Sequence, residues 1–456
     1  MGVRLGSWTP TRFGAATAAL VALMVGTVLV QPAAASSGAV VAWGTTVSAA
    51  AGFRGTLLGV AAAGTTDVWA VGADNPDSSV AQWLDQPYAE HWNGTSWTAT
   101  PVTAPSLYGT HQAAELTGAT AVGPGNAWTV GDVSDLWSTA SQTLAYHWTG
   151  QAWSRTTTPN PAGANGSNRL LAVAARTGSD VWAVGYSGYP ATSLVTHWTG
   201  AAWSTVAVPD IGALQAVAVD PATVWAAGTG AVQRFDGTRW SALPALPVTS
   251  GASLFLHALA KNAAGLWAIG TTSTPYFDGF LYHSYAAVFN GTSWTTVGVP
   301  GDGLNSAATA GAAVLATDSN NGVFRITAGG ATQDVTPAPG TVYPDAVAAD
   351  PAGNAWAVGN AWAVGNGTGQ SPSIINAPGI GQGGIVVTTG AAGATVTWTG
   401  PVNHSGTTDV FGNVSVGGLP DGAYTVIASL GGCTPGVATT TVTAGIATPV
   451  AAHITC

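Results

Sequence analysis

The sequence predicts an all-β protein: a seven-bladed β-propeller closed by an N-terminal strand, followed by a small C-terminal β-sandwich. Two observations carry this prediction. Only 7% of the 456 residues are charged, so the Glu and Lys residues that favour helices are few. A tryptophan-centred unit also recurs at intervals of roughly 40 to 60 residues, a spacing typical of propeller blades. Its tryptophans are Trp69, Trp128, Trp182, Trp225, Trp267 and Trp356.

The N-terminal segment, residues 1–35, has the pattern of a secretory signal peptide. Arg4 and Arg12 precede an apolar run, and three alanines come directly before Ser36. The alternative is a membrane anchor, for which the apolar run is short. We expect cleavage after Ala35 and a mature protein that is secreted and has no membrane-spanning segment.

Residues 36–366 are assigned to the propeller. In the clearest unit, short apolar segments alternate with turn residues, which predicts four antiparallel strands. These segments span 170–175, 181–185, 194–198 and 202–208. Pairs such as Asn93-Gly94 and Thr199-Gly200 supply the positive φ angles of a hairpin between the last two strands.

The propeller is predicted to close through its two ends. Residues 40–47 resemble the end of a unit without its beginning, and the unit that starts near Val342 has a beginning without a clear end. We therefore expect residues 40–47 to be the outer strand of the last blade. A degenerate sixth unit, with 312–318 and 323–327 as its middle strands, brings the count to seven; six or eight blades are the alternatives.

Three histidines, His91, His147 and His197, occupy equivalent positions in successive units. Equivalent positions on packed sheets lie about 10 Å apart, too far for one metal ion. We expect structural imidazoles that form hydrogen bonds between blades, and no metal site or cofactor.

The propeller units resemble the kelch, Asp-box and galactose-oxidase-like group of secreted bacterial propellers. The run Asp236-Gly237-Thr238-Arg239-Trp240 comes near the Asp-box pattern, although the residue between Asp and Gly is missing. The resemblance implies the architecture and no catalytic residues. The copper chemistry of galactose oxidase needs a tyrosine-cysteine crosslink, and residues 36–366 contain no cysteine.

A segment rich in Gly, Ser, Pro and Asn, residues 367–382, reads as a linker. Residues 383–456 alternate apolar and polar side chains and predict the β-sandwich. This part resembles the carboxypeptidase-regulatory, transthyretin-like domain, a structural or adhesive accessory of secreted proteins. The matching positions are Thr408-Asp409, Gly412, Val414, Val416, Leu419-Pro420, Gly422 and Tyr424. The two cysteines, Cys433 and Cys456, are expected to form one disulfide in an exported chain.

The candidate ligand-binding residues lie in the loops that follow the second strand of each blade. Aromatic rings beside carboxylates suit sugars, because the rings stack and the acids accept hydroxyl hydrogen bonds. The residues are Trp83, Trp137, Tyr186, Tyr189, Tyr276, Asp77, Asp85, Asp132 and Asp135.

These loops predict a secreted, monomeric binding or adhesion module for carbohydrate or a cell-surface polymer. With no catalytic constellation evident, we expect no enzyme activity. One alternative is a polysaccharide hydrolase or lyase that uses two of the loop aspartates as acid and base; another is a purely structural surface protein. The net charge of −10 argues against nucleic acid as a partner.

Overall fold

A computed structural model describes residues 44–46, 55–74, 85–123, 125–277, 279–318, 322–335, 343–350, 354–362, 370–377, 383–401, 403–408, 412–419, 422–442 and 447–456. All of them belong to the compact unit Gly38–Cys456. The described part of the chain is all-β, and its helical content is one 3-10 turn, η1 (Gly109–His111). No helix among these residues is long and apolar enough to cross a membrane. The predicted signal peptide, Asp77 and Trp83 lie outside the described residues.

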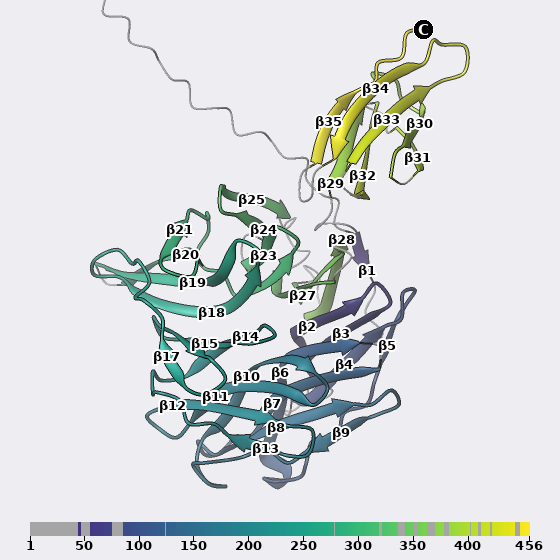
Figure 1. Ribbon diagram of the computed structural model, residues 1–456. Coiled ribbons are helices and arrows are strands. Elements are labelled where there is room, and N and C mark those ends of the chain that lie inside the picture. Colours follow the sequence, from purple (N-terminus) through teal and green to yellow (C-terminus); the bar gives the residue numbers. More distant parts are fainter. Residues whose placement is uncertain are drawn as a thin grey trace, which may run out of the picture. The chain divides into compact units, whose positions relative to one another are not determined.

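The described residues up to Ala377 contain seven four-stranded antiparallel sheets, numbered here 1 to 7 in chain order, and the fold is that of a β-propeller (Figure 1). Sheet 1 contains β2 (Thr56–Gly64), β3 (Asp67–Asp74), β4 (Gln86–Trp92) and β5 (Trp97–Ala99); sheet 2 contains β6 (Gln112–Gly123), β7 (Asn126–Asp135), β8 (Ser141–Trp148) and β9 (Trp153–Thr156). Sheet 3 contains β10 (Asn168–Thr177), β11 (Asp180–Ser187), β12 (Thr192–Trp198) and β13 (Trp203–Thr205); sheet 4 contains β14 (Leu214–Val219), β15 (Val224–Gly228), β16 (Val232–Phe235) and β17 (Trp240–Ala242).

The remaining three sheets keep the same topology. Sheet 5 contains β18 (Ser253–Asn262), β19 (Gly265–Tyr276), β20 (Gly279–Phe289) and β21 (Trp294–Val297); sheet 6 contains β22 (Ser306–Ala310), β23 (Ala313–Asp318), β24 (Gly322–Thr327) and β25 (Gly330–Val335). Sheet 7 contains β26 (Tyr343–Ala349), β27 (Ala355–Trp362), β28 (Gln370–Ala377) and β1 (Gly44–Thr46). The degenerate sixth unit therefore does form a sheet, in which Phe324 and Ile326 are buried in the core.

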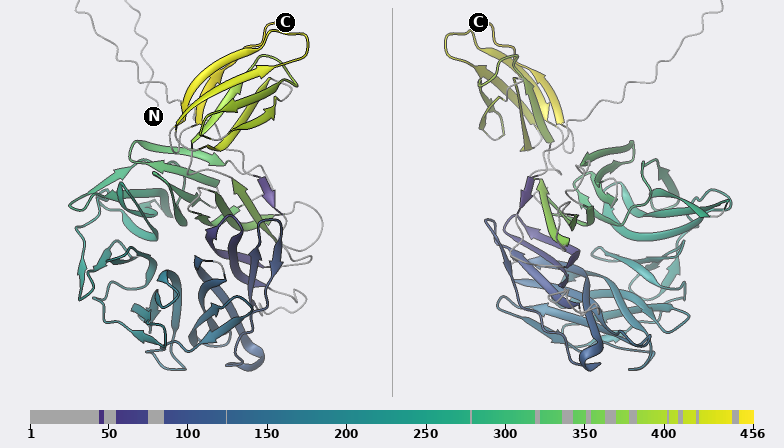
Figure 2. Two further views of the ribbon diagram at one scale, coloured as in Figure 1. Left: turned by 45° about the vertical axis from the view of Figure 1, so that its right-hand side comes forward. Right: turned by 180° about the vertical axis from the view of Figure 1, so that it is seen from behind.

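The first strand of each sheet contacts the first strand of the next one, from β2 through β6, β10, β14, β18 and β22 to β26. β26 in turn contacts β2, and both views of Figure 2 show the purple first sheet beside the green seventh. In sheet 7 the N-terminal strand β1 pairs with β28, with Gly44 opposite Asn376.

Strand β28 corrects one prediction. Residues 367–382 are rich in turn formers and were expected to be a linker, yet Gln370–Ala377 pairs along its whole length with β27. The composition of this segment favours turns, but β28 lies between β27 and β1 in the sheet and forms ladder hydrogen bonds with both. Pairing on both edges therefore outweighs the local preference.

The repeated tryptophan of each second strand explains the spacing of the units. Trp182 is buried, and its indole Nε1 donates a hydrogen bond to Asp180 Oδ1 at 2.8 Å. Its ring packs against Phe235 and Trp240 of the next sheet, with centroid distances of 5.3 and 6.3 Å. The same tryptophan therefore fixes the start of its own strand and the contact between two sheets.

The equivalent histidines take a different role from the expected one. His197 stacks on Trp182 within its own sheet, with ring centroids 3.9 Å apart, and its Nε2 lies 2.8 Å from Asp180 Oδ1. His91 and His147 repeat this arrangement with Asp67 and Asn126. The prediction of hydrogen bonds between blades is wrong, because antiparallel pairing places each histidine directly opposite its tryptophan.

The hairpin between the last two strands is a four-residue loop between paired tryptophans, such as Trp92 and Trp97. Its glycine has the expected positive φ, +98° at Gly94, but the residue before it acts through its side chain. Asn93 Oδ1 accepts hydrogen bonds from the backbone N–H groups of Thr95 and Ser96 at 2.9 and 3.0 Å.

The C-terminal residues form two further sheets. One contains β32 (Asn413–Leu419), β29 (Gly383–Thr388) and β35 (Ala447–Ala451); the other contains β31 (His404–Thr407), β30 (Thr395–Thr399), β33 (Gly422–Ser429) and β34 (Gly436–Val442). Both sheets contribute to one buried cluster around Trp398 and Tyr424. A packed two-sheet core of this kind agrees with the predicted sandwich.

The disulfide prediction is confirmed, since Cys433 Sγ and Cys456 Sγ lie 2.11 Å apart. The bond closes a loop of 23 residues in sequence separation, which stabilises the folded chain by about 3 kcal/mol through loop entropy. We expect the denatured, unreduced protein to give no reaction with a thiol reagent. In the reduced protein, the C-terminal sheets should unfold at a lower temperature. Two titratable thiols before reduction would contradict the bond.

Candidate functional site

A cluster of acids around one arginine joins sheets 2 and 3. Arg169 of β10 donates from Nε to Asp132 Oδ1 at 2.6 Å and from Nη2 to Glu115 Oε1. Glu115 on β6 lies directly opposite Asp132 on β7 in the antiparallel ladder. Ser134 adds a hydroxyl hydrogen bond to Asp132 Oδ2 at 2.5 Å. One guanidinium therefore holds two carboxylates that come from adjacent strands.

The electrostatics of this cluster are dominated by burial. Burial raises the pKa of Asp132, which is only 1% exposed, in spite of the opposing effect of Arg169. Burial, followed by the Asp132 charge, also raises the pKa of Glu115. Burial alone would lower the pKa of Arg169, but the Asp132 and Glu115 charges outweigh it and raise that pKa. The arginine is therefore permanently charged, while its acids are easier to protonate than free ones.

Asp85 belongs to the edge of the same cluster. Its backbone carbonyl accepts a hydrogen bond from Ala114 N at 2.9 Å, next to Glu115. Burial and the neighbouring Asp74 charge raise the pKa of Asp85. The Asp85 charge in turn contributes to the raised pKa of Glu115, so the site disfavours further negative charge.

The structure brings Asp85, Asp132 and Tyr186 of the predicted residues together. Tyr186 is the register partner of Arg169 on β11. The prediction missed Arg169 and Glu115 as site residues. A signal was available, because the runs Glu115-Leu116-Thr117 and Arg169-Leu170-Leu171 occupy equivalent positions in successive units. Aligning these units would have placed an acid and a base at the same height on neighbouring first strands.

Asp135 is the last residue of β7 rather than a loop residue, and it and Trp137, which follows the strand, have other partners. The Asp135 carboxylate accepts hydrogen bonds from Ser138 Oγ at 2.7 Å and Trp137 N at 3.1 Å, which lower its pKa. Trp137 stacks on His111 with ring centroids 3.4 Å apart and is still 67% exposed. Asp135 thus shapes a turn that presents an aromatic ring to solvent.

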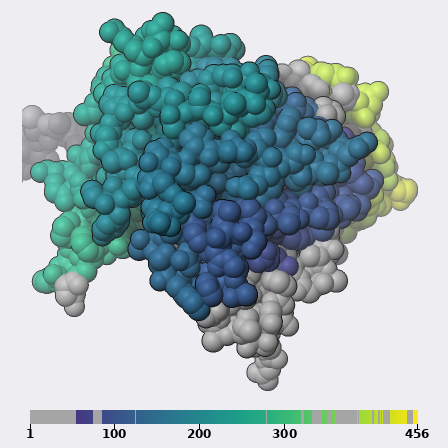
Figure 3. Space-filling model, turned by 90° about the horizontal axis from the view of Figure 1, so that it is seen from below, coloured from purple at the N-terminus to yellow at the C-terminus, as the bar shows by residue number. Residues whose placement is uncertain are grey.

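Tyr189 lies in the turn between β11 and β12 and is 97% exposed, and Tyr276, the last residue of β19, is 54% exposed. Tyr276 ends β19 in a hairpin that extends past the pairing of β19 with β18, and the green end of this hairpin stands out from the surface in Figure 3. Further exposed apolar residues occupy the same hairpin: Phe277, Phe280, Leu281 and Tyr282. Among the described residues, no hydrogen bond or ring contact links Tyr189 or Tyr276 to the arginine cluster.

The described residues contain no group of three or more His, Cys, Asp or Glu side chains that could hold a metal ion. The arginine cluster is itself unsuited to a cation, because Arg169 already fills the position between the two carboxylates. The arrangement can order two sheets and present hydrogen-bonding groups.

No model of a protein family matches the chain, and no curated protein matches it. Among solved structures, it is similar to YCF48 bound to D1 peptide, at 14% identity and a TM-score of 0.46, covering 74% of this chain and 96% of that chain. It is also similar to the WD40 β-propeller domain of Doa1, at 9% identity and a TM-score of 0.45, covering 74% of this chain and 97% of that one. A fungal alcohol oxidase of the AA5 family in complex with copper matches at 10% identity and a TM-score of 0.46, covering 89% of this chain and 100% of that chain.

Proposed function

We propose that the protein is a secreted binding module for carbohydrate or another cell-surface polymer, and that exposed aromatic rings on its propeller loops make the contact. The observation that carries this proposal is the exposure of Trp137, Tyr189 and Tyr276. Folded chains bury rings of this size where they can, and single exposed rings on a rigid scaffold suit stacking on sugar faces.

The loop aspartates support binding better than hydrolysis. Asp132 is buried and engaged by Arg169 and Ser134, and the Asp135 carboxylate is used in a turn. Neither acid is placed to transfer a proton to a polymer at the surface. One observation favours the hydrolase alternative: the raised pKa of Glu115, whose side chain is about a third exposed, is a property of general acids.

The proposal also includes the number of blades, the closure of the propeller by β1, export and the two family resemblances. Seven blades, with β1 as the outer strand of the last one, are supported by the cyclic contacts of the first strands and by the β1–β28 pairing. Export is supported by the disulfide, which needs an oxidising compartment. The kelch and Asp-box relationship remains a resemblance, as does that of the C-terminal sandwich to carboxypeptidase-regulatory domains.

The test is a glycan array on the mature protein, followed by affinity measurements on the best polysaccharide with Trp137→Ala, Tyr189→Ala and Tyr276→Ala. Each loss of a stacking ring should weaken binding by roughly tenfold, about 1.4 kcal/mol, with little change in melting temperature. Val437→Ala removes an exposed apolar side chain from the sandwich and is the matched control.

Binding that survives all three aromatic substitutions would contradict the proposal. Release of reducing ends from the bound polysaccharide, lost in Glu115→Gln, would instead establish the hydrolase alternative.

A further inference from the structure

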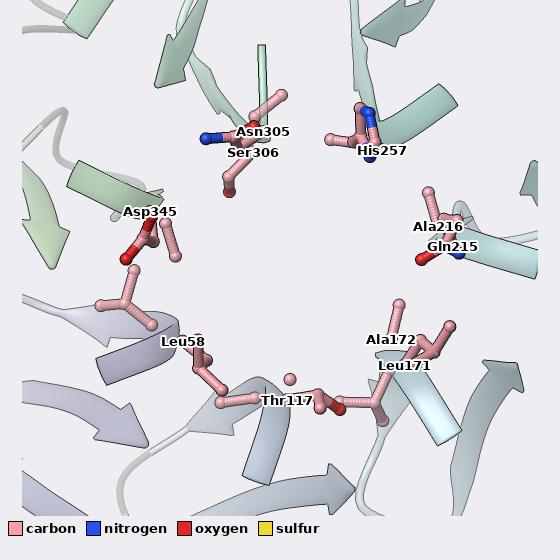
Figure 4. Close-up of a pocket in the computed structure, with 18 of the residues that line it drawn as sticks. Leu58, Thr117, Leu171, Ala172, Gln215, Ala216, His257, Asn305, Ser306 and Asp345 are labelled. Atoms are coloured by element: carbon pink, nitrogen blue, oxygen red, sulfur yellow. The ribbon is translucent and has the colours of Figure 1, made fainter. Parts of the chain in front are cut away.

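The central cavity and a second cavity between sheets 4 and 5 differ in charge. The central one, of about 410 Å³, lies where the first strands converge, and Figure 4 shows side chains from different sheets around it. Residues that a β-bulge removes from the ladder, such as Leu58 and Gln215, line it, and none of its described lining residues is Lys or Arg. The second cavity, of about 690 Å³, is lined by two cationic side chains, those of Arg234 and Lys261.

This second cavity, the Arg234–Lys261 pocket, lies where a ring contact between sheets is missing. In sheets 1 to 3 the repeated tryptophan meets an aromatic ring on the third strand of the next sheet, with centroids 4.8, 5.1 and 5.3 Å apart. Trp225 of sheet 4 belongs to the same buried cluster as Trp294, but no such ring contact joins it to Phe289 on the third strand of sheet 5. Space therefore remains between the two sheets, with Trp225 and Phe289 in its wall.

Arg234 occupies the position that a histidine has in sheets 1 to 3. It lies opposite Trp225 in the ladder, as each histidine lies opposite its tryptophan. Each histidine also has a polar partner at the start of the second strand, namely Asp67, Asn126 or Asp180. Sheet 4 has Thr223 there, and the Arg234 guanidinium has no hydrogen-bond or ion-pair partner among the described residues. Its donors therefore remain available to a ligand.

Lys261, the one lysine of the chain, adds a second positive charge from sheet 5. Its Nζ donates a hydrogen bond to Asn262 O at 2.8 Å, and an ammonium group has three donors. The one acid of the lining, Asp220, accepts hydrogen bonds at Oδ1 from the backbone N–H groups of Ala222 and Thr223, at 3.0 and 2.8 Å. Two cations and one acid leave a positive lining in a chain of net charge −10, which favours an anionic ligand.

The remaining wall of the pocket is largely apolar. Leu243 and Pro244 follow β17 on one side, and Leu266 and Phe289 come from sheet 5 on the other. Phe289 is only partly buried, so its ring offers surface to a ligand. Aromatic rings pack on one another in offset or edge-on arrangements, and cavities of about 300 to 1,000 Å³ hold small organic molecules. An anion with an aromatic body therefore matches both parts of the lining.

We propose that the Arg234–Lys261 pocket binds a small aromatic carboxylate, with its carboxylate at the two cations and its ring against Phe289. A guanidinium binds a carboxylate through two parallel hydrogen bonds, which gives selectivity for this group. The pocket includes Gly265, where β19 begins, whereas the exposed Tyr276 ends the same strand. The pocket and that ring thus lie at opposite ends of β19, and the proposal stands independently of the polymer-binding function.

The experiment is isothermal titration calorimetry of the mature chain with benzoate, with its neutral isostere benzamide, and with acetate. Benzoate should bind saturably. Benzamide lacks the charge and acetate lacks the ring, so each should bind at least roughly tenfold more weakly. Equal binding of benzamide or of acetate, or no saturable binding of benzoate, would overturn the proposal.

Two variants locate the site. Arg234→His copies the residue that sheets 1 to 3 carry at this position, and at pH about 8, where an imidazole is neutral, it should weaken benzoate binding by roughly tenfold or more. Lys261→Met keeps an unbranched side chain without the charge, and should weaken the binding of benzoate but not that of benzamide. Wild-type benzoate affinity in both variants would overturn the assignment, and Lys261→Met decides the matter if Arg234→His fails to fold.

The control for charge is Arg239→Met. Arg239 is exposed on the same sheet outside the pocket lining, and it contributes to its hairpin through its backbone N–H, which donates to Asp236 Oδ1 at 3.0 Å. The substitution therefore removes one positive charge and keeps the turn. Benzoate should bind this variant as it binds the wild type. A loss equal to that of Arg234→His would show a general charge effect and refute a site in the pocket.

Discussion

Replacing Arg169 by methionine is expected to lower the free energy of unfolding by about 3 to 5 kcal/mol, because it leaves a buried carboxylate without its partner. Asp132 is 1% exposed and has Ser134 as its other hydrogen-bond donor. Glu115 loses its ion pair in the same variant. Methionine fills similar space and carries no charge, so the loss is electrostatic rather than steric.

Urea denaturation at neutral pH measures this effect, and its pH dependence identifies the cause. The pKa of Asp132 is already raised by burial and should rise further without Arg169. A carboxyl with a raised folded-state pKa favours folding when protonated, and that contribution is lost as the pH rises from the unfolded pKa through the folded one. The deficit of Arg169→Met should therefore be largest at neutral pH and shrink toward pH about 4.

Two further variants control for this interpretation. Arg239→Met removes an exposed arginine and should change stability by less than about 0.5 kcal/mol. The double variant Arg169→Met with Asp132→Asn should recover part of the loss, since no charge is left buried at that position. A deficit that is independent of pH and not rescued by asparagine would mean that Arg169 acts only through packing.

Trp182→Ala should cost a similar amount, about 3 to 5 kcal/mol, through a different mechanism. The indole contacts His197 of its own sheet and Phe235 and Trp240 of the next one, so its removal leaves a cavity between two sheets. Thermal and urea denaturation should both show the loss. Trp137→Ala, which removes an exposed ring, is the matched control and should be nearly neutral. Equal effects of the two substitutions would contradict the assignment of Trp182 to the core.

The sequence predicted what depends on short-range pattern. The second strands and the hairpin of each unit follow from the tryptophans and the turn residues, so even the degenerate segment 323–327 could be recognised as a strand. Strand β28 was missed, because its turn-rich composition is overruled by pairing with strands distant in the sequence. The disulfide followed from the presence of only two cysteines in a chain expected to be exported.

The candidate site was predicted less completely, for a geometric reason. Asp132 was identified from its place in a loop-rich stretch, but its partner Arg169 lies 37 residues away on another sheet. Which residues of two sheets meet depends on how the sheets stack, and periodicity within one strand holds no information about that. The three histidines are the opposite case. Their tryptophan and Asp or Asn partners lie within the same sheet, so strand register alone determines these contacts.

In sheets 1 to 5 and 7, the register between the first and second strands shifts by one residue, which leaves one first-strand residue outside the ladder as a β-bulge. The residue before the bulge is a buried leucine in sheets 1 to 5 and Pro344 in sheet 7, and the residue after it is Gly or Ala. The residue between them takes no part in the ladder. Copies of the unit within this one chain already carry Leu, Thr, Gln, His and Asp at that position. Substitution at this position therefore disturbs neither the ladder nor the packing of its two flanking residues.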